Sequence, residues 1–337
     1  MAVKKILITG ASGFIGSFLC EKASNLGYEV WAGVRNTSSR KYLNIKGLNF
    51  IELSFEDKIL LSEQLSAYLK SNSPFDYIIH NAGVTKSPKK ENYFQSNYLN
   101  TKNFIEVLSE MSIIPEKFIF TSSLAAFGPA SESSPDIIKL DQKPVPVNLY
   151  GKSKLMAEEY IRSVEGLNYI ILRPTGVYGP RDKDYFQLFN IINRGFEVYI
   201  GTLKQKLTFI YLDDLVNAYF LALSSDKSKT SFFVSESKWY YTCDFYAKIK
   251  KELNKRTIRV VIPLWLIRPL AAINDYIGRM TGNYPTLNND KLAILKAKNW
   301  YCETSQLEKE LNFKTEYDLD SGIKATIKWY RENGWLN

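Results

Sequence analysis

The sequence predicts an α/β protein built on a doubly wound parallel sheet, and three observations carry this prediction. Short apolar strands alternate with helical segments through the first half of the chain. A glycine-rich turn, GASGFIG at 10–16, joins the first strand to the first helix. Polar segments follow the later strands, HNAG at 80–83 and TSS at 121–123 among them. A smaller C-terminal α/β part is expected to form a second domain.

The first two strands and the helix between them follow directly from residues 4–34. KKILITG is a short apolar strand that leads into the glycines, SFLCEKASNLG has helical periodicity and ends at Gly27, and YEVWAGV alternates and is rich in β-formers. The order of strand, glycine turn, helix and strand is that of a nucleotide-binding βαβ unit.

The glycines stand where a dinucleotide requires them, although their spacing is G-x-x-G-x-x-G rather than G-x-G-x-x-G. Gly10 allows the tight turn, Gly13 lets the backbone approach a pyrophosphate, and Gly16 lets the helix pack on the sheet. The helix N-terminus adds N–H groups and a positive dipole. A merely structural loop is the alternative.

The residue after the second strand favours NADP(H) as the cofactor. Arg35 stands where NAD-preferring sites usually carry an acidic residue for the ribose 2′-hydroxyl, and a guanidinium would pair with a 2′-phosphate. If Arg35, Arg40 and Lys41 are simply a solvated loop, NAD(H) remains possible.

Further strands are predicted at 75–83, 117–123 and 168–174, with helices at 93–111 and 150–164. Such alternation implies right-handed crossovers and a ligand crevice at the carboxyl ends of the strands.

The composition of the chain argues for some classes of function and against others. The chain has 337 residues and a net charge of +9, but its lysines are scattered, which favours an anionic small ligand or a membrane surface over nucleic acid. Three dispersed cysteines and one histidine, His80, predict no metal site and argue against a Ser-His-Asp hydrolase. His80 is expected to be a packing residue. The short apolar N-terminus indicates a cytoplasmic protein, with peripheral contact at the inner face of the membrane as an open alternative.

Tyr150 and Lys154 lie one helical turn apart in YGKSK, so both face the same side of a helix. Together with GASGFIG, HNAG, SNYLNT, FTSSLAAFG, LRPTGVYGP and FIYLDDLVNAY, this segment resembles the extended short-chain dehydrogenase/reductase family, which includes NAD-dependent epimerases and dehydratases. The resemblance spans residues 4–223 and implies a Rossmann domain.

The resemblance implies roles for individual residues. Tyr150 is the general acid or base, and the Lys154 ammonium is expected to draw the phenol pKa toward neutrality and to bind the nicotinamide ribose. Ser123 is expected to bind the substrate oxygen, and Asn97 to support this network. Cofactor contacts carried over in the same way fall on Phe14, Ile15, Ala82, Pro174 and Val177.

Two substitutions argue against a sugar-nucleotide substrate. Relatives that bind a diphosphate carry an Asn and an Arg where this chain has Gly176 and Leu207, although Lys206 or Arg181 could compensate. Leu124 and Ala125 replace the acidic pair that dehydratases require.

LRPTGVYGP with AGVRN instead resembles the branch of dihydroflavonol reductases and 3β-hydroxysteroid dehydrogenases, which act on bulky apolar alcohols and ketones. One feature of the family is missing, because Ser54 stands where an aspartate near the adenine is expected. From Trp265 onward, Leu266, Leu270, Ile273, Ile277 and Met280 fall on one helical face, either a helix packing over the cleft or an apolar lid that admits a lipid from a membrane surface.

The leading hypothesis is an NAD(P)H-dependent reductase or dehydrogenase of a ketone or secondary alcohol on a bulky hydrophobic substrate, such as a 3-keto sphingolipid or ceramide-type lipid. An NDP-sugar epimerase and a non-catalytic NADP-sensing protein are the alternatives. The Rossmann domain is expected at 1–178 and 205–230, and a substrate-binding domain at 179–204 and 231–337. The partner is a small-molecule or lipid substrate, with a homodimer through 93–111 and 150–164 as a further possibility.

Overall fold

The computed structural model describes residues 3–131, 137–267, 269, 274 and 289–336. The chain divides into two compact units, each formed by three stretches of sequence. Unit 1 comprises Met1–Ala126, Leu149–Arg173 and Val216–Phe232, and unit 2 comprises Phe127–Asn148, Pro174–Leu215 and Phe233–Asn337.

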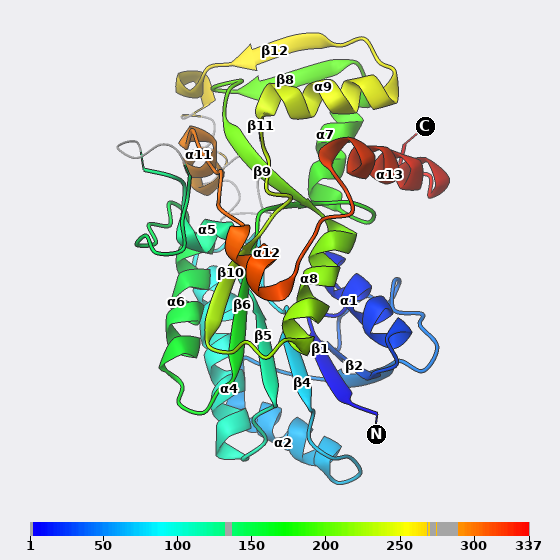
Figure 1. The fold of residues 1–337 in the computed structure, drawn as a ribbon, viewed down its shortest axis with the longest axis vertical. Coiled ribbons are helices and arrows are strands. Elements are labelled where there is room, and N and C mark those ends of the chain that lie inside the picture. Colours follow the sequence, from blue (N-terminus) through cyan, green and yellow to red (C-terminus); the bar gives the residue numbers. More distant parts are fainter. Residues whose placement is uncertain (1–2, 132–136, 268, 270–273, 275–288, 337) are drawn as a thin grey trace. The chain divides into compact units, whose positions relative to one another are not determined.

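A seven-stranded sheet forms the centre of unit 1, with the strand order β10-β6-β5-β4-β1-β2-β3 (Figure 1). Its strands are β1 (Lys5–Thr9), β2 (Glu29–Val34), β3 (Asn49–Glu52), β4 (Tyr77–His80), β5 (Lys117–Thr121), β6 (Tyr169–Pro174) and β10 (Thr230–Val234). The pairs β1–β2, β1–β4, β2–β3, β4–β5 and β5–β6 are parallel. The predicted doubly wound parallel sheet is therefore confirmed.

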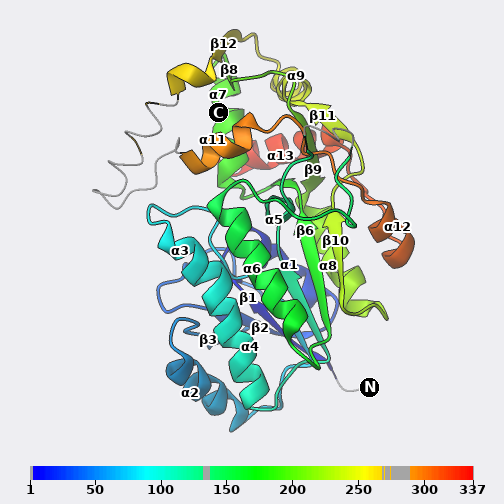
Figure 2. The ribbon, with the colours of Figure 1, turned by 90° about the vertical axis from the view of Figure 1, so that its left-hand side faces the viewer.

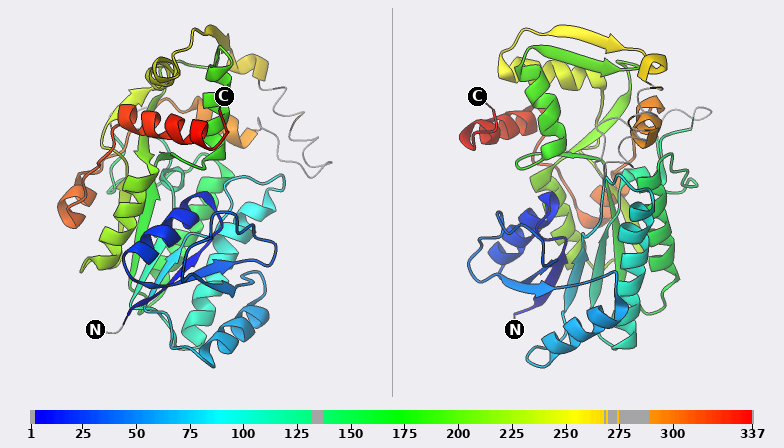
Figure 3. Two further views of the ribbon diagram at one scale, coloured as in Figure 1. Left: turned by 90° about the vertical axis from the view of Figure 1, so that its right-hand side faces the viewer. Right: turned by 180° about the vertical axis from the view of Figure 1, so that it is seen from behind.

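Helices cover both faces of this sheet (Figure 2 and Figure 3). One face carries α2 (Lys58–Leu69), α4 (Asn100–Glu110) and α6 (Leu149–Ser163), and the other carries α1 (Phe14–Asn25) and α8 (Leu212–Ser224). Strand residues such as Leu7, Ile78 and Phe118 pack with Phe104 of α4 and Ile161 of α6 in one hydrophobic core. Burial on both faces is why these strands are continuous apolar runs.

The helix predicted at 93–111 is interrupted. It consists of α3 (Glu91–Phe94), a π-helical turn η1 (Gln95–Leu99) and α4. The buried residue Asn97 lies in this turn, and its carbonyl accepts a hydrogen bond from the Thr101 hydroxyl. Single π turns often accompany functional sites, because they redirect a side chain without ending the helix.

Unit 2 contains two small sheets and an aromatic core. A three-stranded sheet has the order β11-β9-β7, and β12 pairs with β8. The strands of unit 2 are β7 (Gly176–Tyr178), β8 (Phe196–Ile200), β9 (Lys206–Tyr211), β11 (Trp239–Tyr241) and β12 (Ile258–Ile262). The helices of unit 2 are α7 (Lys183–Asn193), α9 (Thr242–Leu253), α11 (Asn289–Lys296), α12 (Ser305–Leu311) and α13 (Leu319–Glu332). The short helix α5 (Leu124–Phe127) contains the point at which the chain passes from unit 1 to unit 2. In the core, Tyr330 and Trp335 stack with their ring centroids 5.5 Å apart.

The apolar face predicted from Trp265 onward is described only in part. Trp265 and Leu266 lie in a helical turn at 264–267, directly after β12. Leu270, Ile273, Ile277 and Met280 lie outside the described residues. Among the described residues, the helices are too short or too polar to cross a membrane.

His80 connects the end of β4 to β1 and to α4, as a buried packing residue would. Its Nδ1 lies 2.9 Å from Thr9 Oγ1, and its Nε2 lies 3.1 Å from Thr101 Oγ1. The Thr101 hydroxyl donates to Asn97, so it must accept from Nε2–H, and Nδ1 then accepts from Thr9. The ring is therefore held as the neutral Nε2–H tautomer, and burial together with the Lys154 charge lowers its pKa to about 3.

This pairing predicts a specific loss of stability in acid. Unfolding frees the ring to bind a proton below its ordinary pKa of ~6.5, whereas the folded ring stays neutral down to about 3. Stabilisation is present above the unfolded pKa and is lost as the pH falls. The free energy of unfolding should fall by about 2 kcal/mol more in the wild type than in His80→Gln between pH 7.5 and 5.0.

The measurement is urea denaturation of both proteins at the two pH values. Because His80 is the chain's one histidine, its ring proton signals are unambiguous in an NMR titration. Ring signals that titrate near pH 6.5 in the folded protein would contradict the assignment.

Candidate functional site

The glycine turn between β1 and α1 is closely packed against the end of β4. Gly10 has a φ of +63°, and a Cβ added there would lie 2.9 Å from the backbone of Ala82. A Cβ at Gly16 would lie 2.1 Å from the Gly10 carbonyl oxygen. Gly13 is exposed, and its N–H donates to the Gly10 carbonyl at 3.0 Å. The chain can follow this path only because Gly10 and Gly16 have no side chain.

The N-terminus of α1 provides a donor set that fits a pyrophosphate. Gly13 is the N-cap and has no side chain to cap the helix, and Phe14 and Ile15 open its first turn, half-buried. The first N–H groups of a helix have no partner within the helix and carry partial positive charge. Ala82, next to this turn, donates its N–H to Thr9 Oγ1 at 3.1 Å.

Arg35 lies exposed directly after β2, beside the glycine turn in the sheet order. In the parallel register, Thr9 pairs with Gly33, so Arg35 follows β2 at the same edge where Gly10 follows β1. The Arg35 N–H donates to Ser38 Oγ at 3.0 Å. Ser54, after β3, receives a hydrogen bond from the Gln64 amide at 3.1 Å.

Ser123, Tyr150 and Lys154 are brought together in unit 1. Ser123 follows β5, and its hydroxyl hydrogen-bonds the Tyr150 phenol at the start of α6. The Lys154 ammonium donates to the Thr121 carbonyl at 2.7 Å and lies 4.7 Å from the Phe120 ring centroid. Ser123 and Tyr150 are half-buried, whereas Lys154 is buried. The Tyr150 side chain is thus partly accessible to solvent, whereas the Lys154 ammonium four residues later on α6 is enclosed.

Asn97 joins this group from the π-helical turn. Its amide donates to the Val84 carbonyl and to Ser153 Oγ, both at 3.0 Å, and its Oδ1 accepts from the Val84 N–H at 2.8 Å. Gly83 fits between the two elements, because a Cβ there would lie 2.6 Å from Asn97 Oδ1 and 3.1 Å from Lys154 Nζ. Asn97 is therefore locked in place next to the ammonium.

The expected effect of Lys154 on Tyr150 is wrong for this structure. Burial raises the pKa of Tyr150 to about 12, and the hydrogen bond from Ser123 opposes the rise. Burial lowers the pKa of Lys154 to about 8, which the Glu158 charge opposes. The ammonium is directed at the Thr121 carbonyl, so spacing along the helix alone did not place it on the phenol. Tyr150 is consequently protonated at neutral pH.

A buried ion-pair network holds α6, and the sequence motifs did not predict it. Arg173 on β6 binds the Glu158 carboxylate through two hydrogen bonds of 2.9 and 2.6 Å. Ser122 and Arg162 also donate to Glu158. Burial alone would raise the pKa of Glu158, but the two arginines keep it below its usual value. Glu158 follows Lys154 by one helical turn. This i, i+4 spacing is the sequence feature that could have indicated that Glu158 is a charged neighbour of Lys154.

The positions that bind diphosphate in sugar-nucleotide enzymes are apolar in unit 2. A Cβ at Gly176 would lie 2.4 Å from the Tyr185 hydroxyl and 3.1 Å from Phe209, so Tyr185 occupies the space of a larger side chain. Leu207 packs against the aromatic core. The Lys206 ammonium lies 4.8 Å from the Trp239 ring centroid.

Pro174 and Val177 lie on either side of this position along the chain. Pro174 ends β6 and is buried, and Val177 is the middle residue of β7, half-buried. Both belong to unit 2, whereas Ser123, Tyr150, Lys154 and the glycine turn belong to unit 1.

Comparison with known proteins identifies the family. Residues 6–234 match the model of the NAD dependent epimerase/dehydratase family. The human sterol-4-alpha-carboxylate 3-dehydrogenase, decarboxylating, is 24% identical, with 97% of this chain and 88% of that protein covered. The UDP-glucose 4-epimerase of Vibrio cholerae is 25% identical, with coverages of 96% and 95%.

A solved structure agrees at the level of the fold. The UDP-glucose 4-epimerase of Thermus thermophilus, solved as a complex with NAD, superposes with a TM-score of 0.76 at 20% identity, and the match covers 97% of this chain and 99% of that one. The Rossmann-like assignment and the resemblance seen in the motifs are both confirmed. The chain belongs to the NAD dependent epimerase/dehydratase family, whose members include dehydrogenases and epimerases.

Proposed function

We propose that this protein is an NADPH-dependent reductase of a ketone on a bulky hydrophobic substrate, with Tyr150 as the proton donor. The observation that carries the proposal is the hydrogen-bonded pair of Ser123 and Tyr150 next to the buried Lys154. Burial keeps the phenol protonated at neutral pH, which is the form a reductase needs. The alkoxide produced from a ketone is a much stronger base than a phenolate, so proton transfer to it is favourable.

Each residue then has a defined task. A bound nicotinamide supplies the hydride. The Ser123 hydroxyl and the Tyr150 phenol both hydrogen-bond the substrate oxygen, and Tyr150 gives up its proton as negative charge develops there. Lys154 is proposed to bind the nicotinamide ribose, and Asn97 to support this network through its hydrogen bonds to Val84 and Ser153.

Binding of the cofactor is assigned to the glycine turn and to the neighbouring loops. Gly10, Gly13, Gly16 and the first turn of α1 would hold the pyrophosphate, and Arg35 the 2′-phosphate. Ala82 is proposed to contact the cofactor through its backbone, as are Phe14 and Ile15. Pro174 and Val177 are proposed to border the nicotinamide, as the resemblance implies.

Gly176 and Leu207 support a hydrophobic substrate over a sugar nucleotide, because neither position offers a polar side chain. Tyr185 fills the space that an asparagine at Gly176 would need, and Leu207 offers a diphosphate no hydrogen bond. The sterol dehydrogenase relative acts on a substrate of this class by its name. We propose a 3-keto group on an acyl lipid, such as a sphingoid or ceramide precursor, as the substrate. NDP-sugar epimerisation is the second candidate, because the Vibrio cholerae relative is equally similar.

A substrate screen separates these candidates. Oxidation of NADPH should be seen with a 3-keto sphingoid base and with a 3-keto sterol, and no conversion should be seen with UDP-glucose or dTDP-glucose. Absorbance at the reduced nicotinamide band measures the first reaction, and sugar analysis by mass-resolved chromatography measures the second. Turnover of the sugars alone would replace the lipid proposal with the epimerase.

Removing one hydroxyl tests the proton donor. Tyr150→Phe should lower kcat by about 10²–10⁴-fold, because the alkoxide loses its proton source, while the Kd for NADPH changes little. The matched control is Tyr160→Phe on the same helix, where the ring lies near Lys102. Steady-state kinetics with fluorescence titration of NADPH gives both quantities, and an unchanged kcat in Tyr150→Phe would refute the mechanism.

Cofactor choice is tested at Arg35. Arg35→Ala should weaken NADPH binding by about 1.5–3 kcal/mol, the range for a lost hydrogen bond to a charged group, and should leave NADH binding nearly unchanged. Arg40→Ala serves as the control, because its guanidinium lies 4.4 Å from the Phe50 ring centroid in the same loop region. Equal weakening of both cofactors in Arg35→Ala would show that Arg35 does not contact the phosphate.

A further inference from the structure

One face of the β8–β12 strand pair in unit 2 is made entirely of apolar residues. The parallel register pairs Phe196 with Ile258, Val198 with Val260 and Ile200 with Ile262. Alternate residues of a strand point to the same side, and paired residues of neighbouring strands share a side. We call the surface formed by these six residues the outer face.

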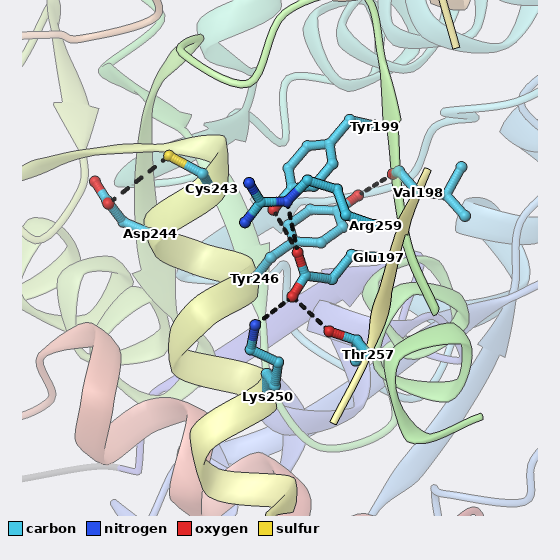
Figure 4. A network of polar contacts seen from close by, with 9 residues as sticks. All are labelled: Glu197, Val198, Tyr199, Cys243, Asp244, Tyr246, Lys250, Thr257 and Arg259. Carbon is cyan, nitrogen blue, oxygen red and sulfur yellow. Dashed lines mark hydrogen bonds and ion pairs between the residues drawn. The ribbon is translucent and has the colours of Figure 1, made fainter. Parts of the chain in front are cut away.

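The polar groups of the two strands are engaged on the opposite side, toward α9 (Figure 4). There the buried Glu197 carboxylate accepts hydrogen bonds from four side chains, namely Lys250 at 2.5 Å, Thr257 at 2.6 Å, and Tyr199 and Arg259 at 3.3 Å each. Hydrogen bonds and ion pairs therefore join β8, β12 and α9 through the inner side. The two strands that carry the outer face are therefore held in place by these contacts with α9.

Three of the six residues of the outer face are exposed, toward the end where both strands begin. Ile258 is 66% exposed, Phe196 46% and Val260 37%. At the other end, Ile200 and Ile262 pack against a small cluster around Ile267 and Leu292.

Two further exposed apolar side chains lie in the helical turn after β12, beyond the end of the strands at which Ile200 and Ile262 pair. Trp265 is 68% exposed and Leu266 43%. Exposed apolar side chains gathered on one surface, as Phe196, Ile258 and Val260 are, mark a place where something binds.

Positive charge borders the most exposed end. Because β8 and β12 are parallel, both start there, and the Ile258 N–H donates to the Gly195 carbonyl at 2.9 Å. Arg194 shortly precedes β8, and Lys255 and Arg256 shortly precede β12, with both Lys255 and Arg256 exposed. The outer face thus combines large apolar side chains with a cationic border.

We propose that the outer face, with Trp265 and its cationic border, docks on the surface of an anionic lipid bilayer. Phe196, Ile258 and Val260 enter the boundary between headgroups and acyl chains, and Lys255 and Arg256 pair with lipid phosphates. Tryptophan at the edge of such a patch has its preferred place at the headgroup level. This proposal goes beyond the reduction assigned above and does not depend on it.

The cationic border distinguishes a bilayer from a second copy of the chain. Two copies joined through the outer face would each add the same border of Arg194, Lys255 and Arg256 to the interface, so neither copy would neutralise the charge of the other. An anionic bilayer neutralises the same charges. The chain's net charge of +9 also favours an anionic bilayer over a second copy of the chain.

Sedimentation of the full-length protein with vesicles tests the proposal without substrate or cofactor. The protein should co-sediment with phosphatidylcholine vesicles in which about one lipid in three is phosphatidylglycerol, and not with phosphatidylcholine alone. The double variant Ile258→Asp/Val260→Asp should reduce the bound fraction about tenfold or more, because charged side chains do not enter the acyl boundary. Lys255→Glu/Arg256→Glu should reduce it by about the same factor at low salt and should abolish its salt dependence.

The matched control is Ile59→Asp on α2 in unit 1, where the isoleucine is 75% exposed. Its binding should equal that of the wild type. All variants are compared by thermal melting, and NADPH binding by the aspartate double variant separates a surface defect from misfolding. No binding to anionic vesicles by the wild type overturns the proposal, as does equal binding by the aspartate double variant. A wild-type dimer that this variant converts to monomers, without vesicle binding, assigns the outer face to a second copy instead.

Discussion

The buried ammonium of Lys154 is the charge around which the polar interior of unit 1 is arranged. A cation in a low-dielectric interior requires acceptors and nearby negative charge, and here it has the Thr121 carbonyl, the Phe120 ring face and the Glu158 carboxylate one turn along α6. The same charge helps to keep His80 neutral. The neutral ring in turn joins Thr9 to Thr101, whose hydroxyl binds the Asn97 carbonyl. The strand before the glycine turn and the helix that carries Tyr150 are therefore linked through one connected set of hydrogen bonds.

Much of this arrangement could be predicted from the sequence, because it depends on local chemistry. The apolar runs indicated the strands, and the glycines of GASGFIG indicated the turn, since only residues without a side chain fit against Ala82 and Gly10. Ser123 was expected at the end of a strand, and in the structure it follows β5. The NADP preference and the roles of the individual site residues stay predictions, because they concern groups that bind to the protein.

Other features depend on contacts that a linear sequence does not contain. The π-helical turn at 95–99 has the composition of an ordinary helix, and it is distinguished by the hydrogen bonds of Asn97 to Val84 and Ser153. The phenol pKa was misjudged for the same reason, because helical spacing gives the side that Lys154 faces and not the acceptor that its ammonium selects. Likewise, nothing in GVYGP shows that the Tyr185 hydroxyl fills the space beside Gly176.

The geometry around Gly83 has a consequence for how the site could be controlled. A single added carbon there would press on the Asn97 amide oxygen and on the Lys154 nitrogen at once. Neither the Asn97 amide nor the Lys154 ammonium would be chemically altered, but the distance between them would change. The missing side chain of Gly83 thus sets the distance between these two groups, and a larger residue there would displace them without replacing Tyr150 or Lys154.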